Sequence, residues 1–372
     1  MTGPIQGAHM AETNVLSLPV ELEGITRDWL QTALRGYAPG VRVRKFEMVD
    51  FIRTTCTKIR IRLELENNPP GAPIPETVIL KGGFEPHSRK MWPMHMNEAL
   101  SYGTLMPQLG LRVPTPYFAG WDEKNQQGIV IMEDLVARGA EFCSPLRPHS
   151  FEHTEKRIRA LARFHAQTWD SPQIRPGGRW GWLSDVPANW NHYFGEYLEP
   201  KVWHHYINSP RGAAASTEFH DRHWMQDALD RMAALAKTLP YCANHGDTHI
   251  GNQYVDVDGE PGFFDCIAGA APGILEVSYH LGCALDLATR RKYEGALIQT
   301  YLEELRANGA TAPRYEEAMH QYAVFLAFGY AVFIINEAIF QTEANNTAYT
   351  ARFSQAMLDH DTKGRLADLP LA

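Results

Sequence analysis

The stretch from residue 244 to residue 265 constrains this chain more than any other part of it. A polar loop that carries Asp247 and Asn252 comes first, and two short apolar runs follow on either side of Asp258-Gly259. Asp-Gly between apolar runs is a strong β-hairpin signal, because tight hairpin turns need residues that tolerate a positive φ. Such a hairpin would return Asp265, at the end of the second run, to the loop. Two carboxylates and one carboxamide are therefore expected to meet at one rim.

Carboxylate and amide oxygens are ligands that magnesium prefers, and this set suits a magnesium-bound nucleotide whose terminal phosphate is attacked by a hydroxyl. The protein-kinase catalytic loop reads His-Arg-Asp followed by four residues and Asn. Here His245-Gly246-Asp247 precedes Asn252 at the same interval, with glycine in place of arginine. A short motif of this kind also arises by chance in solvated loops. The hairpin and the second acid favour the phosphotransferase loop.

Composition places the chain among ordinary globular proteins that are long enough for two domains. It has 372 residues, of which 44% are hydrophobic and 21% are charged. The net charge of −8, without a run of Lys or Arg, argues against a nucleic-acid partner. The cysteines are odd in number and form no Cys-x-x-Cys pair, which favours free thiols in the cytoplasm over disulfides or a zinc site. They are Cys56, Cys143, Cys242, Cys266 and Cys283.

No stretch of the sequence predicts a targeting signal or a membrane span. Residues 1–9 lack the charged and apolar regions of a signal peptide and are typical of a cloning remnant ahead of Met10. The most apolar stretch, residues 323–340, is interrupted by Gly329 and by Asn336-Glu337. A membrane span needs ~20 largely apolar residues. We therefore expect a buried core helix there and no membrane partner.

The N-terminal third predicts an antiparallel sheet with helices beside it. Thr26 is positioned to cap a helix over residues 27–34, because a Thr side chain can accept from the first free backbone N–H groups. Alternating apolar residues over the range 41–66 predict half-exposed strands, and residues 77–81 predict a further strand. Strands followed later by helices indicate an α+β fold.

Lys81 ends that further strand, and Glu98 is the only acid inside a helix predicted over residues 97–106. Taken alone, Lys81 is an ordinary exposed strand end and Glu98 an ordinary first-turn acid. Kinases, however, hold nucleotide phosphates with a strand lysine that is paired with a helix glutamate. Beside Asp247 and Asn252 we favour the second interpretation for both residues.

An apolar strand over residues 128–132 runs into Glu133-Asp134-Leu135, where a kinase would present backbone groups to an adenine. Periodicity does not distinguish this junction from the end of any central strand. We expect a domain boundary there, with residues 10–135 as the N-terminal nucleotide-binding lobe and residues 136–372 as a mainly helical, catalytic lobe. His165 lies on the apolar stripe of a helix in the second lobe, which predicts a hydrogen-bonded core histidine rather than a ligand.

Large aromatic side chains crowd the region from residue 180 to residue 206, among Gly and Pro breaks. Some of them must pack in a core, and others could line a pocket for an apolar or ring-bearing molecule. The candidates for such a pocket are Trp180, Trp182, Trp190, Tyr193 and Trp203.

These motifs together resemble the aminoglycoside phosphotransferase/choline kinase-like superfamily. The likeness rests on the His245-to-Asn252 loop, the later Asp265, the Phe164-His165-Ala166 segment and Glu133-Asp134-Leu135. The segment 276–281, Glu-Val-Ser-Tyr-His-Leu, more narrowly resembles the ecdysteroid kinase-like branch of small-molecule kinases. The resemblance implies a protein-kinase-like bilobal fold, with an antiparallel sheet in the N-terminal lobe and a larger helical C-terminal lobe.

The resemblance also implies roles for individual residues. It makes Asp247 the catalytic base and gives Asn252 and Asp265 to Mg²⁺. It assigns ATP contacts to Lys81, to Glu98 through Lys81, to the backbone of Glu133, Asp134 and Leu135, and to the loop that contains Thr54 and Thr55. His249 is implied either as loop scaffold or as a phosphate contact.

The activity that follows is transfer of the γ-phosphoryl of ATP to a hydroxyl of a small molecule. The aromatic region favours an apolar or ring-bearing acceptor over an aminoglycoside, since a polycation needs a dense acidic pocket. The loop 53–57 has no glycine where relatives often carry one. A catalytically weak, nucleotide-binding pseudokinase is therefore the alternative from a different class.

Overall fold

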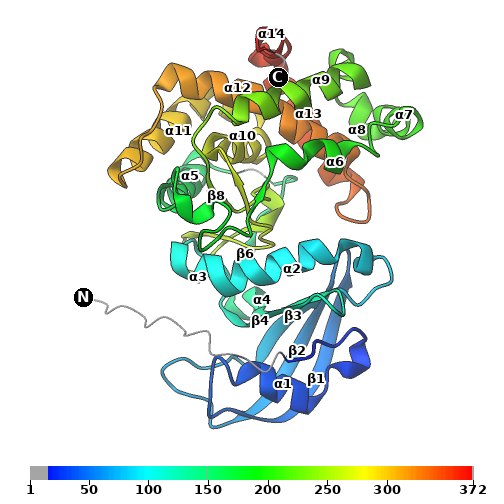
Figure 1. Cartoon of the computed structure of the whole chain (residues 1–372), viewed down its shortest axis with the longest axis vertical. Helices are drawn as coiled ribbons and strands as arrows, with labels where there is room; N and C mark the ends of the chain where they lie inside the picture. The colour runs from blue at the N-terminus through cyan, green and yellow to red at the C-terminus, as the bar shows by residue number, and fades with distance from the viewer. Residues whose placement is uncertain (1–15, 148, 371–372) are drawn as a thin grey trace. The chain divides into compact units, whose positions relative to one another are not determined.

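The computed structural model describes residues 16–147 and 149–370, which form two compact units (Figure 1). The smaller unit contains residues 16–103 and 115–133, and the larger unit contains residues 104–114 and 134–370. The expected cloning remnant, residues 1–9, lies outside the described residues.

The smaller unit is built on a five-stranded antiparallel sheet in the order β1-β2-β3-β5-β4. In β2 the buried residues Ile59, Ile61 and Leu63 alternate with more exposed ones, as the sequence pattern predicted. The strands are β1 (Arg42–Arg53), β2 (Thr57–Glu66), β3 (Thr77–Gly82), β4 (Pro116–Asp122) and β5 (Gln127–Glu133).

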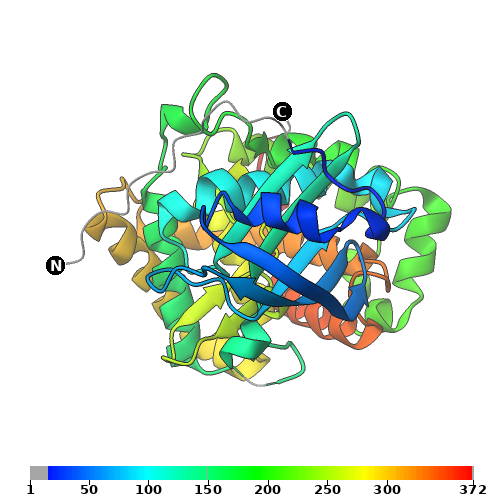
Figure 2. The same ribbon diagram turned by 90° about the horizontal axis from the view of Figure 1, so that it is seen from below.

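Two helices cover opposite faces of this sheet (Figures 1 and 2). The Thr26 side chain caps α1 (Arg27–Leu34), whose buried residues share one core cluster with Ile59 and Leu80. Lys81 follows Leu80 and points to the other face, where it meets Glu98 of α2 (Trp92–Leu100). The helix predicted over residues 97–106 is therefore shifted, because α2 ends at Leu100 and a π-helical turn (Ser101–Leu105) follows.

The larger unit is mainly helical, so that the predicted α+β class is confirmed. Helix α12 covers most of the apolar stretch 323–340, for which the sequence predicted a core helix. The helices are α3 (Met106–Leu109), α4 (Leu135–Arg138), α5 (Phe151–Ala166), α6 (Trp190–Phe194), α7 (Pro200–Ile207), α8 (Pro210–Ala213), α9 (Arg222–Ala236), α10 (Gly273–Ala284), α11 (Leu287–Ala307), α12 (Tyr315–Ile335), α13 (Glu343–Asp359) and α14 (Thr362–Ala367).

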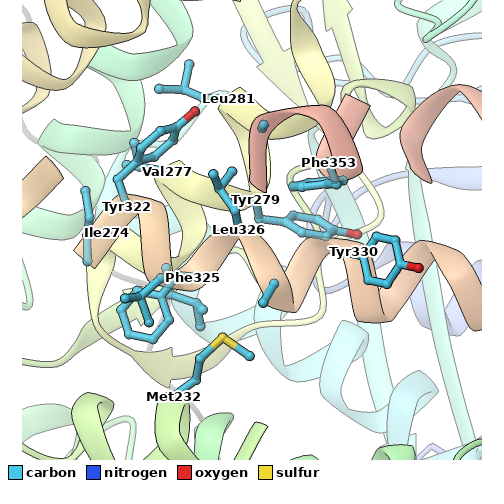
Figure 3. Packing of buried hydrophobic residues seen from close by; sticks show 14 of the residues in the cluster. Met232, Ile274, Val277, Tyr279, Leu281, Tyr322, Phe325, Leu326, Tyr330 and Phe353 are labelled. Carbon is cyan, nitrogen blue, oxygen red and sulfur yellow. The ribbon is translucent and has the colours of Figure 1, made fainter. Parts of the chain in front are cut away.

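The core of the larger unit forms where α9, α10, α12 and α13 meet (Figure 3). Tyr279 and Val277 of α10 lie beside Leu326 of α12 and Phe353 of α13, all of them buried. Helix α12 is long and apolar enough to cross a membrane by length and composition, but 72% of its most apolar window is buried inside this unit. It is a core helix, as its sequence predicted.

Two small sheets in the larger unit carry the loop that the sequence singled out. Strands β9 (Gln253–Val255) and β10 (Pro261–Phe263) pair antiparallel, which confirms the predicted hairpin, and β6 (Glu141–Phe142) pairs with β9 on its other edge. The second sheet has the order β7-β11-β8, with β7 (Ser184–Asp185), β8 (Cys242–Asn244) and β11 (Gly269–Ala271). The loop that connects β8 to β9 contains Asp247 and Asn252.

Candidate active site

The loop after β8 is held against the segment that follows Asp265. The Ile267 N–H donates to the His245 carbonyl at 3.0 Å. Gly246 has a φ of +90°, and a Cβ added there would lie 1.9 Å from the Ile267 carbonyl oxygen. Only glycine fits this left-handed and crowded position. The glycine that replaces the kinase arginine is thus required by the backbone of this loop.

Asp247 and Asn252 are brought together by this loop. The Asn252 Nδ2 donates to Asp247 Oδ2 at 2.8 Å and to the Asp247 carbonyl at 3.1 Å. The Tyr279 hydroxyl donates to the other carboxylate oxygen, Oδ1, at 3.0 Å. The His249 Nε2 lies 3.6 Å from Asp247 Oδ2. Both oxygens of Asp247 are therefore oriented, while 29% of its side chain stays exposed.

Asp265 follows the hairpin, whose end is bonded to this loop. The N–H of Phe264, one residue earlier, donates to the Asn252 carbonyl at 3.0 Å. Asp265 has a φ of +56°, an uncommon conformation that Asp tolerates better than most residues and that tends to occur at functional sites. Burial lowers the pKa of His245, and the nearby charges of Glu276, Asp247 and Asp265 oppose that shift. The two aspartates thus both lie within electrostatic reach of the His245 ring.

The donor set fits a hard cation such as Mg²⁺. Because Asn252 Nδ2 donates to Asp247, its Oδ1 is turned away, and no described residue donates a hydrogen bond to that oxygen. A carboxamide oxygen and the Asp265 carboxylate are the kinds of ligand that Mg²⁺ takes while it keeps several waters. In residues 16–147 and 149–370, no cluster of three or more His, Cys, Asp or Glu side chains could hold a metal ion. An ion held by Asn252 and Asp265 would take its remaining ligands from water and from nucleotide phosphates.

Glu276 anchors the start of the loop from α10. Its carboxylate accepts from the N–H groups of His245 (3.0 Å) and Gly246 (2.8 Å) and lies 2.9 Å from His165 Nε2. His165 in turn bonds the Tyr301 hydroxyl through Nδ1 at 2.8 Å, and it is fully buried. The prediction of a hydrogen-bonded core histidine is confirmed. Burial alone would raise the pKa of Glu276, but the hydrogen bond and charge of His165, the charge of His245 and the Gly246 N–H together lower that pKa.

In the smaller unit, Lys81 and Glu98 form a buried ion pair. The Lys81 ammonium donates to Glu98 Oε1, with side-chain exposures of only 5% and 10%. Burial and then the charge of Lys81 lower the pKa of the neighbouring His95 to about 4, so that this ring is neutral near pH 7. A buried, oriented ammonium is what a phosphate-binding lysine needs. Sequence reasoning paired Lys81 with Glu98 and gave no role to His95.

The turn that joins β1 to β2 contains Thr54 and Thr55, and segment 85–88 holds it. His87 Nε2 lies 2.8 Å from the Thr54 carbonyl, and Ser88 Oγ donates to the Thr55 carbonyl at 3.1 Å. Arg53 at its start pairs with Glu85 at 2.8 Å. None of residues 53–57 has a positive φ. The turn is therefore built without strain from residues other than glycine.

The junction Glu133-Asp134-Leu135 is tied down by its own polar groups. The Glu133 carboxylate accepts from the N–H and hydroxyl of Thr115, at 3.3 and 3.2 Å. The Asp134 side chain caps α4 by accepting from the Val136 N–H at 3.1 Å. The Leu135 carbonyl accepts from the Ala140 N–H at 3.0 Å, and its side chain is buried. The side chains of all three residues thus have structural roles.

The five aromatic pocket candidates separate into buried and exposed rings. Trp190 and Trp203 are 3% exposed and belong to the core of the larger unit, where Trp190 stacks on Phe328. Trp180 is 8% exposed and donates from Nε1 to the Thr104 carbonyl. Trp182 is partly buried, and Tyr193 is 56% exposed. Only Tyr193 offers most of its ring to a ligand in this structure.

Three residues close to the loop were missed by the sequence reasoning. Tyr279 contacts Asp247, and Tyr349 and Gln341 contact the His249 ring. His249 itself, predicted as a nucleotide contact or loop scaffold, is 4% exposed and lies beside Asp247. No local signal marks the missed residues, because they approach the loop from α10, from α13 and from the segment before α13.

Comparison with known proteins gives matches to solved structures only. No protein-family model matches the chain, and no curated protein sequence matches it. The structure of spectinomycin phosphotransferase APH(9)-Ia with ADP and spectinomycin aligns at a TM-score of 0.50 and 12% identity, over 91% of this chain and 99% of that one. The GDP and kanamycin complex of APH(2")-IIia also aligns at a TM-score of 0.50, with 10% identity. That alignment covers 89% of this chain and 98% of the other. Choline kinase LicA from Streptococcus pneumoniae aligns at a TM-score of 0.49 and 11% sequence identity. That alignment covers 90% of this chain and 97% of LicA.

These matches define the class of the fold. The chain shares the fold of these two phosphotransferase structures, and the protein-kinase-like, α+β architecture predicted from the sequence is confirmed. At 10–12% identity the likeness extends to the fold alone. The narrower likeness to the ecdysteroid kinase-like branch stays a prediction.

Proposed function

We propose that this chain is an ATP-dependent phosphotransferase that moves the γ-phosphoryl group to a hydroxyl of a small molecule. The observation that carries the proposal is the hydrogen bond from Asn252 to Asp247, within a loop of kinase spacing whose backbone is fixed by Glu276. The buried pair of Lys81 and Glu98 supports it independently. Phosphoryl transfer requires mainly alignment and charge neutralisation from a protein, and these residues can supply both.

In the proposed reaction, the oxygen of the acceptor hydroxyl bonds to the γ-phosphorus while Asp247 accepts the hydroxyl proton. The bond from that phosphorus to the β–γ bridging oxygen breaks, and ADP leaves. Asn252 and Asp265 would hold Mg²⁺, which neutralises phosphate charge when bound. Lys81 would contribute a fixed positive charge to the phosphates, with Glu98 keeping it in place. The turn at Thr54 and Thr55 and the backbone from Glu133 to Leu135 are proposed to contact the nucleotide.

The nucleotide is proposed to be ATP, with GTP as the control. The two structural matches at a TM-score of 0.50 were solved with ADP and with GDP, so this fold holds either purine. We place the reaction in the cytoplasm, in keeping with five cysteines that are all free thiols.

The acceptor is proposed to be small and ring-bearing. Tyr193 is exposed and lies within electrostatic reach of Asp247 and Glu337. The Tyr197 hydroxyl donates to Glu337 at 3.2 Å, and Tyr206 lies 6.4 Å from Tyr197 between ring centroids. Aromatic faces near the proposed base suit an apolar ring, and Glu337 suits one positive charge on it.

The test is phosphate transfer to a panel of small alcohols, followed by the mass gain of the acceptor and by ADP release. Asp247→Asn keeps the shape of the side chain but removes the base, so we expect nucleotide binding to persist and transfer to fall by about 10²- to 10⁴-fold. Asp227→Asn is the matched control, because Asp227 pairs with Arg231 within α9 rather than with the loop. Full turnover by Asp247→Asn would remove the base assignment. Mg-ATP binding without any product across the panel would favour a pseudokinase.

A further inference from the structure

Four aromatic rings stack on one another, and two of them contact the loop that contains Asp247. Tyr279 of α10 and Phe333 of α12 are nearly parallel, with ring centroids 5.6 Å apart and an interplanar angle of 8°. Phe333 also stacks on Tyr349 of α13 at 4.1 Å, and Phe353 lies 6.1 Å from Tyr279. All four residues are at most 4% exposed. Rings packed at this density have a fixed orientation, and so do the hydroxyl groups that they carry.

The hydroxyl of Tyr279 reaches the carboxylate of Asp247. It donates to Oδ1 at 3.0 Å, whereas Asn252 donates to Oδ2 at 2.8 Å. Burial and then the charge of Asp247 raise the pKa of Tyr279 well above its ordinary value, so the hydroxyl keeps its hydrogen and remains a donor. The carboxylate is therefore fixed at both oxygens, and its plane cannot turn freely about the Cβ–Cγ bond.

The hydroxyl of Tyr349 reaches the ring of His249. It lies 3.2 Å from His249 Nδ1, and the Gly251 N–H donates both to that nitrogen (3.0 Å) and to the Tyr349 oxygen (3.1 Å). A backbone N–H can only donate, so Nδ1 is an acceptor, and the ring turns its other nitrogen, Nε2, away from Tyr349. That nitrogen lies 3.6 Å from Asp247 Oδ2 and 3.0 Å from Gln341 Nε2. Tyr349 thus sets which edge of His249 is presented to Asp247.

We propose that Tyr279 and Tyr349 are positioning residues that aim the Asp247 carboxylate at the acceptor hydroxyl, Tyr279 directly and Tyr349 through the His249 ring. The inference rests on the proposed role of Asp247 as the base and adds residues from α10 and α13 to that site. Transfer rates depend steeply on the direction from which a base meets the hydroxyl, whereas the ground-state binding of nucleotide does not involve this angle.

Removing each hydroxyl alone tests the proposal. For Tyr279→Phe we expect kcat to fall by about 10- to 100-fold, the size of one hydrogen bond to a charged group, with the KM for ATP changed by less than about threefold. For Tyr349→Phe we expect a smaller fall of about 3- to 10-fold, because its effect passes through His249. The double variant should lose less than the product of the single losses, since both act on one carboxylate.

Tyr330→Phe is the matched control. Tyr330 is a fully buried tyrosine of α12, and its hydroxyl donates to the Phe219 carbonyl at 3.4 Å, on a segment other than the loop. We expect wild-type kcat from it. An equal loss of kcat in Tyr330→Phe and Tyr279→Phe would assign the effect to core packing and overturn the proposal, as would normal turnover by Tyr279→Phe.

A crystal structure of Tyr279→Phe separates this inference from the proposed function. A rotated Asp247 carboxylate in the variant supports the positioning role even if the wild-type protein phosphorylates no acceptor, in which case the proposed function fails alone. An unchanged carboxylate in the variant overturns the positioning role whatever the activity.

Discussion

The substitution Glu276→Gln probes how firmly the proposed catalytic loop is anchored. The Glu276 carboxylate is 4% exposed and meets three donors, the N–H groups of His245 and Gly246 and the Nε2 of His165. A glutamine keeps the shape but has one acceptor oxygen and one NH₂ group. The NH₂ group must therefore face at least one buried donor.

The expected loss follows from that count of donors. A buried donor without a partner costs about 1–3 kcal/mol, and the remaining bonds lose the strengthening that a charged acceptor gives. We expect the free energy of unfolding of the larger unit to fall by about 3 kcal/mol. For a unit of this size, each kcal/mol lowers Tm by roughly 2–4 °C, so Tm should fall by about 6–12 °C.

The assay is urea and thermal unfolding followed by fluorescence, with phosphate transfer measured in parallel. Glu303→Gln is the matched control, because Glu303 is exposed on α11 and accepts a hydrogen bond from the nearby Gln299 at 2.8 Å. The free energy of unfolding of Glu303→Gln should lie within about 0.5 kcal/mol of the wild-type value. If the free energy of unfolding of Glu276→Gln is within about 1 kcal/mol of the wild-type value, the three hydrogen bonds do not anchor the loop and this reasoning is refuted.

Three further predictions concern the metal, the ion pair and pH. Asp265→Asn, which tolerates the positive φ at this position, should keep the fold but weaken Mg²⁺-dependent ATP binding by about tenfold or more in calorimetry; unchanged affinity would remove Asp265 from the ligand set. Lys81→Met leaves the buried Glu98 carboxylate without its partner charge and should lower the free energy of unfolding in urea by about 3–5 kcal/mol. The double variant Lys81→Met with Glu98→Leu should restore most of that loss. A single variant as stable as the wild type would contradict a tight ion pair. The hydrogen bond from Arg291 lowers the pKa of Asp359 in the folded state, so the stabilising contribution of Asp359 is complete above pH ~4 and is lost as the pH falls below that value. The free energy of unfolding of Asp359→Asn should therefore depend less steeply on pH from pH ~4 downward. The same dependence as in the wild type would contradict this prediction.

Local sequence signals were sufficient for several strands, for the apolar core helix α12 and for the hairpin. The hairpin was predictable because Asp258-Gly259 and the flanking apolar runs are adjacent in sequence and specify a turn by their own conformational preferences. Lys81 and Glu98 are only 17 residues apart, and a strand followed directly by a helix limits where the glutamate can lie. The Asp247-to-Asn252 contact is equally local, at five residues.

Contacts that span many residues were not predictable from one sequence. Tyr279 lies 32 residues from Asp247, and Tyr349 lies 100 residues from His249, so that only the packing of α10 and α13 brings them to the loop. Trp190 and Trp203 were pocket candidates by composition, but large rings gain most by burial, and both lie in the core. The glycine-free turn at Thr54 suggested weak catalysis, yet its backbone has no position that requires glycine.

The most direct test of the central claim is the mass of a small hydroxylated acceptor after incubation with Mg-ATP and this protein. The account predicts a gain of one phosphoryl group that matches the ADP released, and the loss of that gain in Asp247→Asn with its ATP binding retained. A phosphorylated product formed equally well by Asp247→Asn would contradict the account, because the proton would then leave the acceptor without this carboxylate.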